Sequence, residues 1–311
     1  MMRGTLRFVG RRLLLVAPLI LTAVTVTFLL MRVMPGDPAE LIAGPDGSRE
    51  AVAAIRHSLD LDRPIIVQYG LYLAKLMEGD FGTSTMTGRP VVYEIRQRIP
   101  ITIILTGGAM AFAVAVGPLL GMLAAFRRNT MLDYVLSATS VAGVSIPSFW
   151  LGLMLIFIFA GQLRWLPSMG VGSLANWVLP CITLGLGPLG LLARMTRATM
   201  LDVMGESYIW TARSKGVPEY LIVARHGLRN TLVPLVTIIG TQIGYMLGGA
   251  MVTETVFSLP GFGRLIVDAV LSKDYALVQA GILITSVLVI IVNLMVDLSY
   301  FALDPRVRGR S

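Results

Sequence analysis

Uncharged stretches long enough to cross a bilayer recur along the chain, and short polar segments separate them. A membrane-spanning helix needs roughly 20 apolar residues. Splitting the sequence at its charged residues leaves six such runs: Leu13–Met31, Ile99–Phe126, Tyr134–Leu163, Trp165–Ala193, Asn230–Thr253 and Tyr275–Val296. The pattern predicts an all-α integral membrane fold with six transmembrane helices, and six crossings return the chain to the side on which it began.

Composition supports the membrane class. Hydrophobic residues make up 55% of the chain and charged residues only 14%, whereas soluble domains carry roughly 25% charged residues. The first apolar run follows Arg11-Arg12 as a signal peptide would. It is too long for that role and no small-residue cleavage site follows it, so we expect a retained anchor.

The placement of lysine and arginine predicts the orientation, because cytoplasmic loops are enriched in both. Segments on the side of the N-terminus hold 15 basic and 5 acidic residues, a net charge of +10, and the opposite side has a net charge of −1. Both termini and the central polar segment are therefore expected in the cytoplasm. The overall charge of +8 reflects this topology and does not indicate a nucleic-acid surface.

The only long loop, from Val33 to Arg98, is expected on the outer side. Within it, Ser48–Leu59 is predicted to be a short helix capped by Ser48, and Gly79–Ser84 has the composition of a turn. Pro64–Met77 is predicted to be an amphipathic helix, with one face made of Ile65, Tyr69, Tyr72, Leu73 and Leu76. Val91, Ile95 and Ile99 indicate a further helix that leads into the second span. We expect a compact helical cap rather than a separate enzyme domain.

These elements divide the chain into four parts. Residues 1–32 form the cytoplasmic N-terminus and first helix, and residues 33–98 form the outer cap. Residues 99–303 form a five-helix core that includes a cytoplasmic loop at 199–230, and residues 304–311 form a cytoplasmic tail.

The cytoplasmic loop contains two predicted short helices that break at Gly216-Val217-Pro218. Glycine favours the left-handed residue that ends a helix, and proline favours the start of the next one. The loop is rich in apolar side chains, namely Tyr208, Ile209, Trp210, Tyr220, Leu221 and Ile222. Such a surface, bordered by Arg213 and Lys215, is typical of a helix that docks into a partner's groove. A solvated basic loop is an alternative, and a DNA-reading helix-turn-helix is disfavoured because membrane spans hold both ends.

Small residues and prolines mark special positions in the spans. Gly240, Gly244 and Gly248 recur every four residues, as do Gly117 and Gly121. Such strips allow close helix approach, either within the chain or at a subunit interface. Prolines inside apolar runs, namely Pro147, Pro180 and Pro188, are expected to bend or open their helices.

Motifs of catalysis are missing from the sequence. It contains no phosphate-binding loop, no His-Glu-x-x-His and no Gly-x-Ser-x-Gly. Cys181, His57 and His226 do not have the spacing of a zinc site, and Cys181 is expected to be a small buried hydrophobe. We therefore expect a transport subunit with no nucleotide site, cofactor or metal of its own.

Polar residues in the spans are candidates for a translocation path. Gln242 and Tyr245 lie in the fifth run, and Asn293 and Asp297 lie in the sixth. Asp297 is a functional candidate because ionisable groups are costly at membrane depth, although an interfacial ion pair with Arg194 or Arg197 is the favoured interpretation. Glu254 and Phe257, at the outer end of the fifth run, are candidates for an outer gate or for a segment that only packs.

The central loop resembles the cytoplasmic EAA loop of permease subunits of bacterial ATP-binding-cassette (ABC) importers. Gly216, Ala212 and Leu228 match the glycine, second alanine and leucine of the general motif, while the positions Trp210, Thr211, His226 and Arg229 depart from it. The chain is more similar to the peptide and nickel branch of the family. The matching segments are Thr211–Gly216, His226–Asn230, Met34–Pro38, Gly79–Ser84, Arg194–Arg197, Phe257–Gly263 and Asp304–Arg308.

The resemblance implies a type I ABC importer permease fold in the bacterial cytoplasmic membrane. It also implies a homologous second permease, two ATPase subunits that bind ATP and magnesium, and an extracytoplasmic solute-binding protein. The residues implied to couple the chain to the ATPases are Glu206, Tyr208, Trp210, Ala212, Arg213, Lys215 and Gly216.

The expected substrate is a dipeptide or oligopeptide, and glutathione-like compounds and nickel chelates of the same branch are alternatives. A stand-alone secondary transporter or channel is the rival from another class. That rival needs an ion-coupling site, for which Asp297 is the one buried charge available. An integral-membrane enzyme is the least favoured, because the spans hold no acid–base pair.

Overall fold

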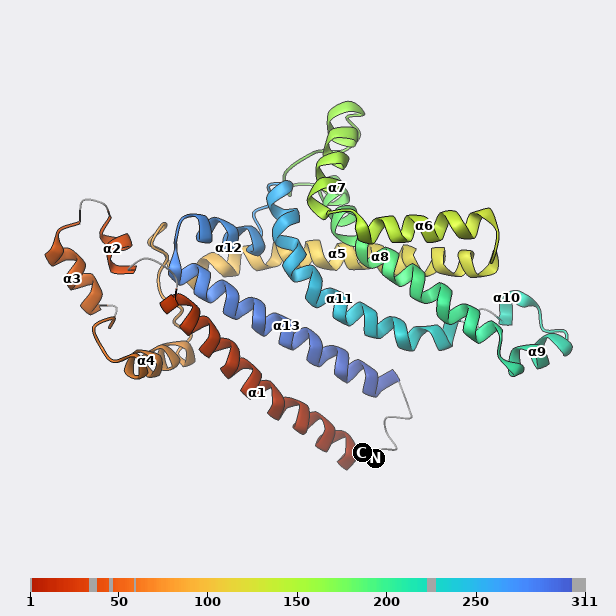
Figure 1. Cartoon of the computed structure of the whole chain (residues 1–311), viewed down its shortest axis with the longest axis horizontal. Helices are drawn as coiled ribbons and strands as arrows, with labels where there is room; N and C mark the ends of the chain where they lie inside the picture. The colour runs from red at the N-terminus through yellow and green to blue at the C-terminus, as the bar shows by residue number, and fades with distance from the viewer. Residues whose placement is uncertain (1, 34–37, 45–46, 59, 223–227, 304–311) are drawn as a thin grey trace. The chain divides into compact units, whose positions relative to one another are not determined.

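The computed structural model describes residues 2–33, 38–44, 47–58, 60–222 and 228–303, and regular structure in these ranges is helical (Figure 1). The elements are α1 (Met2–Val33), α2 (Pro38–Ala43), α3 (Arg49–Ser58), α4 (Ile65–Met77), α5 (Val91–Phe126), α6 (Met131–Ser145), α7 (Ser148–Leu155), the π-helix η1 (Ile156–Gln162), α8 (Ala175–Met204), α9 (Ser207–Ser214), α10 (Glu219–Ile222), α11 (Leu228–Val256), α12 (Phe262–Leu271) and α13 (Tyr275–Leu303). The predicted all-α class is confirmed.

The helices form two compact units. Unit 1 contains Met1–Leu13, Ile101–Leu259 and Ile291–Ser311, and unit 2 contains Leu14–Pro100 and Pro260–Ile290. The division of the chain into an N-terminal helix, an outer cap, a five-helix core and a tail stays a prediction. Each unit is described by itself below.

Helix α8 is the centre of unit 1. It packs against α6, α7 and α11, and Figure 1 shows it running between α6 and α11. Its apolar window is 56% buried, against 22% to 33% in the other three long apolar helices. Leu179, Leu184, Leu189 and Leu192 supply the core contacts of this helix. The remaining helices of unit 1 are therefore arranged around α8.

Glycine residues bring the backbones of neighbouring helices against α8. A Cβ atom on Gly121 of α5 would lie 2.3 Å from the carbonyl oxygen of Ala193, and one on Gly190 of α8 would lie 2.3 Å from that of Ser140 in α6. These separations are far below van der Waals contact, so no other residue fits without moving a helix. In a membrane, where packing replaces the hydrophobic effect, such approaches hold helices together. The Gly117/Gly121 strip is thus an intramolecular contact.

The glycine strip on α11 (Gly240, Gly244 and Gly248) is covered by a neighbouring helix at one end and exposed at the other. A Cβ atom on Gly240 would collide with the side chain of Val296, whereas one on Gly248 would meet nothing within 4 Å. Gly240 is therefore an internal contact. Gly248 leaves a bare position on an exposed face of α11.

The third apolar run is not one straight helix. Helices α6 and α7 meet at Ile146-Pro147 at an angle of 107°, as expected from the missing N–H and fixed φ of proline. Pro180 and Pro188, in contrast, lie inside the continuous helix α8. The expectation that prolines bend or open their helices is thus confirmed for Pro147. Pro180 and Pro188 do not open α8, and a bend at these two positions stays a prediction.

The described residues hold four helices that are long and apolar enough to cross a membrane, or five if the bent pair counts as one span. The first run contributes a shorter apolar helix, Leu14–Leu30. The count of six spans stays a prediction.

In unit 2, helix α4 packs on the C-terminal half of α1 around a buried glutamine. Gln68 accepts hydrogen bonds from the guanidinium of Arg32, with the shorter at 2.5 Å, and donates to the backbone carbonyls of Leu61 and Arg63 in the loop before α4. Tyr69 and Tyr72 pack on Phe28, with ring centroids 5.2 and 5.6 Å from it. The amphipathic helix is confirmed, but its face differs from the predicted one, because Gln68 is buried and Ile65 is 59% exposed.

The capped helix predicted after Ser48 is confirmed, since the Ser48 hydroxyl oxygen accepts a hydrogen bond from the Ala51 N–H at 3.1 Å. The turn at Gly79–Ser84 opens a tight hairpin that ends where α5 begins. Ser84, which is buried, donates to the carboxylate of Asp274 at 2.5 Å. That carboxylate also accepts from the Leu277 N–H at 3.2 Å and so caps α13.

We expect Gly121→Ala to lower the midpoint of thermal unfolding in detergent, because the added methyl group must separate α5 from α8. Overpacking of this kind costs about 1–3 kcal/mol. Gly107→Ala on the same helix is the matched control, since its Cβ would meet nothing within 4 Å. Equal midpoints for the two variants would contradict the close contact.

Candidate functional site

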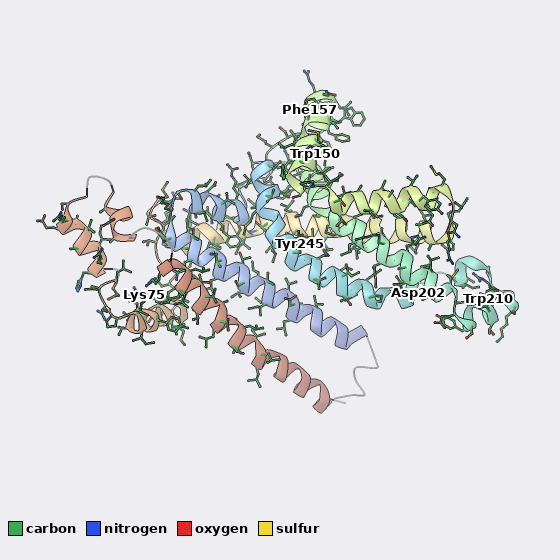
Figure 2. All side chains as sticks on the ribbon, in the orientation of Figure 1. Lys75, Trp150, Phe157, Asp202, Trp210 and Tyr245 are labelled. Carbon is green, nitrogen blue, oxygen red and sulfur yellow. The ribbon has the colours of Figure 1, made fainter. Side chains whose placement is uncertain are left out.

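A short helical segment continues from the C-terminal end of α8. Gly205 and Glu206 separate α8 from α9, and the Ile209 N–H donates to the Glu206 carbonyl at 3.0 Å, which starts the new helix. Figure 2 shows Asp202 on the last turn of α8 and Trp210 beyond it on α9. The segment is therefore attached directly to the most buried helix of unit 1.

Gly216 ends α9 in the predicted left-handed conformation, with φ +74°. Its N–H donates to the Arg213 carbonyl at 2.9 Å, and the Val217 N–H donates to the Ala212 carbonyl at 3.2 Å. These are the two hydrogen bonds of a Schellman motif, and both Val217 and Ala212 pack against the cluster of Val203, Ile209 and Ile222. The motif fixes the angle at which the chain leaves α9 for Pro218 and α10.

The inner face of the segment packs on the end of α8. Ile209 and Ile222 are fully buried and form a cluster with Val203. The prediction that Ile209 and Ile222 belong to an exposed apolar surface is therefore wrong. They hold α9 and α10 together and against α8, which makes the segment a packed extension of that helix.

The outer face of α9 carries the aromatic side chains. Trp210 is 62% exposed and Tyr208 is 41% exposed. The Arg213 guanidinium lies 5.6 Å from the centre of the Trp210 ring, in the range of a cation–π contact. Glu206 and Lys215 are exposed as well, while Ala212 is half-buried. Trp210, Tyr208, Lys215 and Glu206 are thus accessible, and Tyr208 and Trp210 flank the buried Ile209 because positions two apart lie roughly 200° apart around an α-helix.

Parts of the predicted motif lie outside the described residues. These parts are residues 223–227, which include His226, and the side chains of Tyr220 and of Leu228, Arg229 and Asn230. Residues 34–37 and 304–308 of the other matching segments also lie outside the described residues.

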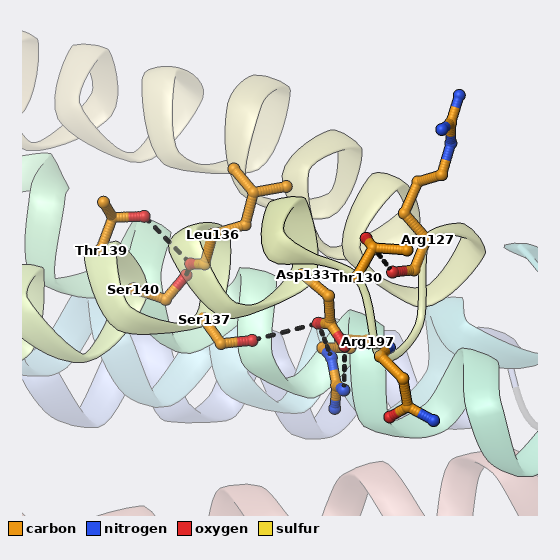
Figure 3. Close-up of polar contacts among 9 residues, drawn as sticks. Arg127, Thr130, Asp133, Leu136, Ser137, Thr139, Ser140 and Arg197 are labelled. Atoms are coloured by element: carbon orange, nitrogen blue, oxygen red, sulfur yellow. Dashed lines mark hydrogen bonds and ion pairs between the residues drawn. The ribbon is translucent and has the colours of Figure 1, made fainter.

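Two helical turns before the end of α8, an ion pair joins α8 to α6 (Figure 3). Arg197 donates from Nε to Oδ1 of Asp133 at 2.6 Å and from Nη2 to Oδ2 at 2.7 Å. Arg197 is therefore paired with Asp133. The side chain of Asp297 lies outside the described residues, so its expected pairing with Arg194 or Arg197 stays a prediction. Sequence analysis counted Asp133 only toward the loop charge, since its partner is 64 residues away.

A second accessible surface lies on α11. Tyr245 is 78% exposed in the middle of this apolar helix (Figure 2), Thr241 and Gly248 on the same face are exposed, and Gln242 is half-buried. Asn293 on α13 is exposed too. Hydrogen-bonding groups at membrane depth seldom face lipid, so this face of α11 is suited to a water-filled path or to another subunit.

The proposed gate residues occupy the interior of unit 1. Phe257 belongs to a buried cluster with Leu105 and Leu179. Glu254 is fully buried and accepts a hydrogen bond from the Thr102 hydroxyl of α5. Their role in an outer gate stays a prediction.

The described side chains include no group of three or more His, Cys, Asp or Glu residues placed to hold a metal ion. Cys181 is a half-buried thiol within the α8 core.

A bundle of apolar helices with an accessible aromatic segment at one end defines a polytopic membrane transport subunit. Residues 117–309 match the family described as "Binding-protein-dependent transport system inner membrane component", and residues 5–106 match its N-terminal counterpart. The chain belongs to this family of ABC importer permeases, in the dipeptide, oligopeptide and nickel branch, and is a multi-pass protein of the inner membrane.

Individual relatives agree with this assignment. The chain is 44% identical over 303 residues to the "Glutathione transport system permease protein GsiC" of Salmonella choleraesuis, covering 97% of this chain and 99% of the relative. The protein of the same name from Escherichia coli K12 is 43% identical over the same length. An inward-facing structure of the MetNI methionine ABC transporter aligns with TM-score 0.60 and 19% identity, covering 68% of this chain and 97% of that chain. The fold is that of an ABC importer permease.

We expect Gly216→Val to disturb the segment through backbone conformation alone. A Cβ atom there would meet nothing within 4 Å, but an L-residue at this positive φ costs roughly 1–2 kcal/mol, and more if it is β-branched. Gly216→Asn is the matched control, because asparagine tolerates the left-handed region. Limited proteolysis in the loop should be faster for the valine variant and near the wild-type rate for asparagine. Equal rates for the two variants would contradict the conformational requirement.

The face of α11 can be tested by thiol labelling after Cys181 is replaced by alanine. If this face of α11 borders an aqueous path, we expect Tyr245→Cys to react with a membrane-impermeant, water-soluble maleimide in the assembled transporter. Leu119→Cys on α5 is the control. Leu119 is also more than half exposed, but its side chain is apolar, as expected of a position that faces lipid. An unreactive Tyr245→Cys would show that this face contacts lipid or protein instead.

Proposed function

We propose that the chain forms half of the translocation path of an ATP-driven importer and is moved by partner ATPases that bind α9. A homologous second permease supplies the other half, and an extracytoplasmic solute-binding protein delivers the substrate. ATP and magnesium are bound by the ATPase subunits. The proposal agrees with the family, whose members work with ATPase and binding-protein partners.

The observation that carries the proposal is the construction of α9. Trp210 and Tyr208 are accessible on either side of Ile209, which is fully buried against the end of α8. An exposed tryptophan next to an arginine is typical of an interface anchor. Because the helix is packed on its support, a force applied to Trp210 displaces α8 rather than an unattached loop.

The motion follows from this arrangement. When the ATPases bind ATP and close, they draw α9 with them, and unit 1 rotates as a rigid body between outward-open and inward-open states. Gly216 keeps the docking helix at its angle, and Arg213 and Lys215 fix its register on the partner electrostatically. The substrate shifts the equilibrium between the states only through its different affinity for each.

The substrate is proposed to be a short peptide of the glutathione type. Relatives with 43% to 44% identity are glutathione permeases, and glutathione is itself a tripeptide. The accessible groups on α11, Thr241 and Tyr245, are uncharged hydrogen-bonding groups, which suits the passage of a zwitterion without trapping it. Gln242 and Asn293 extend the proposed path, and Glu254, Phe257 and Asp297 remain candidates at its ends.

The orientation is proposed from charge. The side that holds the N-terminus, the segment 199–230 and the C-terminal tail carries a net charge of +10, which favours the cytoplasm. That side is also where the ATPases and their nucleotide are found, so charge and coupling agree.

We expect Trp210→Ala to abolish most ATP-dependent uptake in vesicles that contain the complete importer. Truncation of an interface anchor weakens association by about 2 kcal/mol, or roughly 30-fold. Trp165→Ala is the matched control, because Trp165 is 70% exposed but lies in the loop after η1. Uptake is measured with labelled glutathione and with dipeptides, at matched amounts of permease in the membrane.

Wild-type uptake in the Trp210→Ala vesicles would refute the coupling role of α9. Uptake by this chain alone, without ATP or partner subunits, would instead support the stand-alone transporter.

A further inference from the structure

The contact between α6 and α8 extends over the whole length of α6. Near its C-terminal end, Gly143 lies against Leu186, and in its middle the Ser140 carbonyl lies against Gly190. At its N-terminal end, Asp133 binds Arg197. Asp133 precedes Ser140 by seven residues and Arg197 follows Gly190 by seven, so the two antiparallel helices stay in register for two further turns, about 10 Å.

The Asp133 carboxylate is fully engaged by this contact. Besides the two bonds from Arg197, it accepts from the Asn129 N–H at 3.0 Å and from the Ser137 hydroxyl at 3.3 Å. Asn129 has a left-handed φ of +62°, which turns its N–H toward the carboxylate between α5 and α6. Four donors approximately saturate a carboxylate, and the paired guanidinium bonds set its orientation as well as its position.

The location of the ion pair relates it to the ATPase-docking helix. Arg197 lies seven residues, or about 10 Å of helix, before the end of α8 at Met204, and α9 is packed on that end. Asp133 is only 2% exposed. The pair is therefore the polar contact between α6 and α8 at the end of α8 to which α9 is attached.

We propose that the Asp133–Arg197 ion pair is a positioning contact that makes α6, and the α7 arm bent from it by 107°, move with α8 when the ATPases displace α9. The proposal rests on the proposed function. The glycine contacts between α6 and α8 contain no directional bond, so by themselves they do little to oppose sliding of one helix along the other. The two parallel hydrogen bonds of the Asp133–Arg197 pair oppose this sliding near the C-terminal end of α8, to which α9 is attached.

We expect variants of the ion pair to uncouple substrate uptake from ATP hydrolysis without reducing the amount of folded protein. Asp133→Asn leaves Arg197 without its charge partner, so α8 moves while α6 follows incompletely. In vesicles with the complete importer, uptake per ATP hydrolysed should fall about ten-fold, within the 5- to 150-fold range typical of coupling between sites. A purely structural role would lower uptake and ATP hydrolysis in proportion and leave their ratio unchanged.

A second set of variants removes the risk of a buried unpaired charge. The double substitution Asp133→Leu and Arg197→Met replaces the pair by apolar side chains, which buried ion pairs usually tolerate in folding, and it should show the same reduced ratio. Arg197→Lys keeps the charge but not the two parallel bonds, so its ratio should fall between that of the double variant and that of the wild type. Arg194→Gln, three residues away on the exposed side of α8, should keep the wild-type ratio.

Failure of this proposal can be told apart from failure of the proposed function. If the wild-type importer takes up glutathione with ATP and Trp210→Ala does not, the proposed function stands whatever the ion-pair variants do. If the folded Leu/Met double variant then takes up as much substrate per ATP hydrolysed as the wild type, the positioning role of the pair is overturned. If the wild type shows no ATP-driven uptake, both proposals fall.

Discussion

The direct contact of helix backbones at α8 is the constraint on which unit 1 depends. Lipid offers no hydrophobic gain for bringing two apolar helices together, so association relies on close packing and on hydrogen bonds. Gly121 and Gly190 allow this packing because the neighbouring carbonyl oxygens occupy the space that a side chain would need. With α5, α6 and α11 fixed on it, α8 also determines the position of everything attached to its C-terminal end.

Two accessible surfaces follow from this arrangement. One is the aromatic face of α9, held at the end of α8 by Ile209 and Val203. The other is the polar face of α11 around Tyr245, which α8 leaves uncovered. Helix α8 remains unbroken at Pro180 and Pro188 and so extends from the buried core of unit 1 to the segment that leads into α9. One continuous helix, α8, thereby connects the proposed ATPase-docking surface on α9 to the helices of unit 1.

Sequence reasoning could predict features that depend on local chemistry. Gly216 was assigned its left-handed conformation and Ser48 its capping role because each preference resides in one residue and its immediate neighbours. The same holds for the helix that begins near Val91. The break at Pro147 was expected as a bend, but its angle of 107° depends on what α7 packs against, and hydropathy is the same for a straight and a broken run.

Features set by tertiary contacts could not be predicted in this way. Ile209 and Trp210 are adjacent large apolar residues, and only the packing on α8 decides that the first is buried and the second exposed. The Asp133–Arg197 pair joins residues 64 positions apart, so each charge by itself is indistinguishable from the other loop charges. Gln68 is a polar residue in an apolar stretch, and its buried position becomes understandable only once the Arg32 guanidinium lies beside it.

The most direct test of the rigid connection from α9 through α8 to the membrane helices is a distance between spin labels in the assembled importer. With Cys181 replaced by alanine, one label is placed at the exposed Ser207 at the start of α9 and the other at the exposed Thr139 on α6. We expect one narrow distance distribution that is the same without nucleotide and with ATP bound, because both sites move as one body. A distance that changes between the two states while uptake proceeds would contradict this rigid connection.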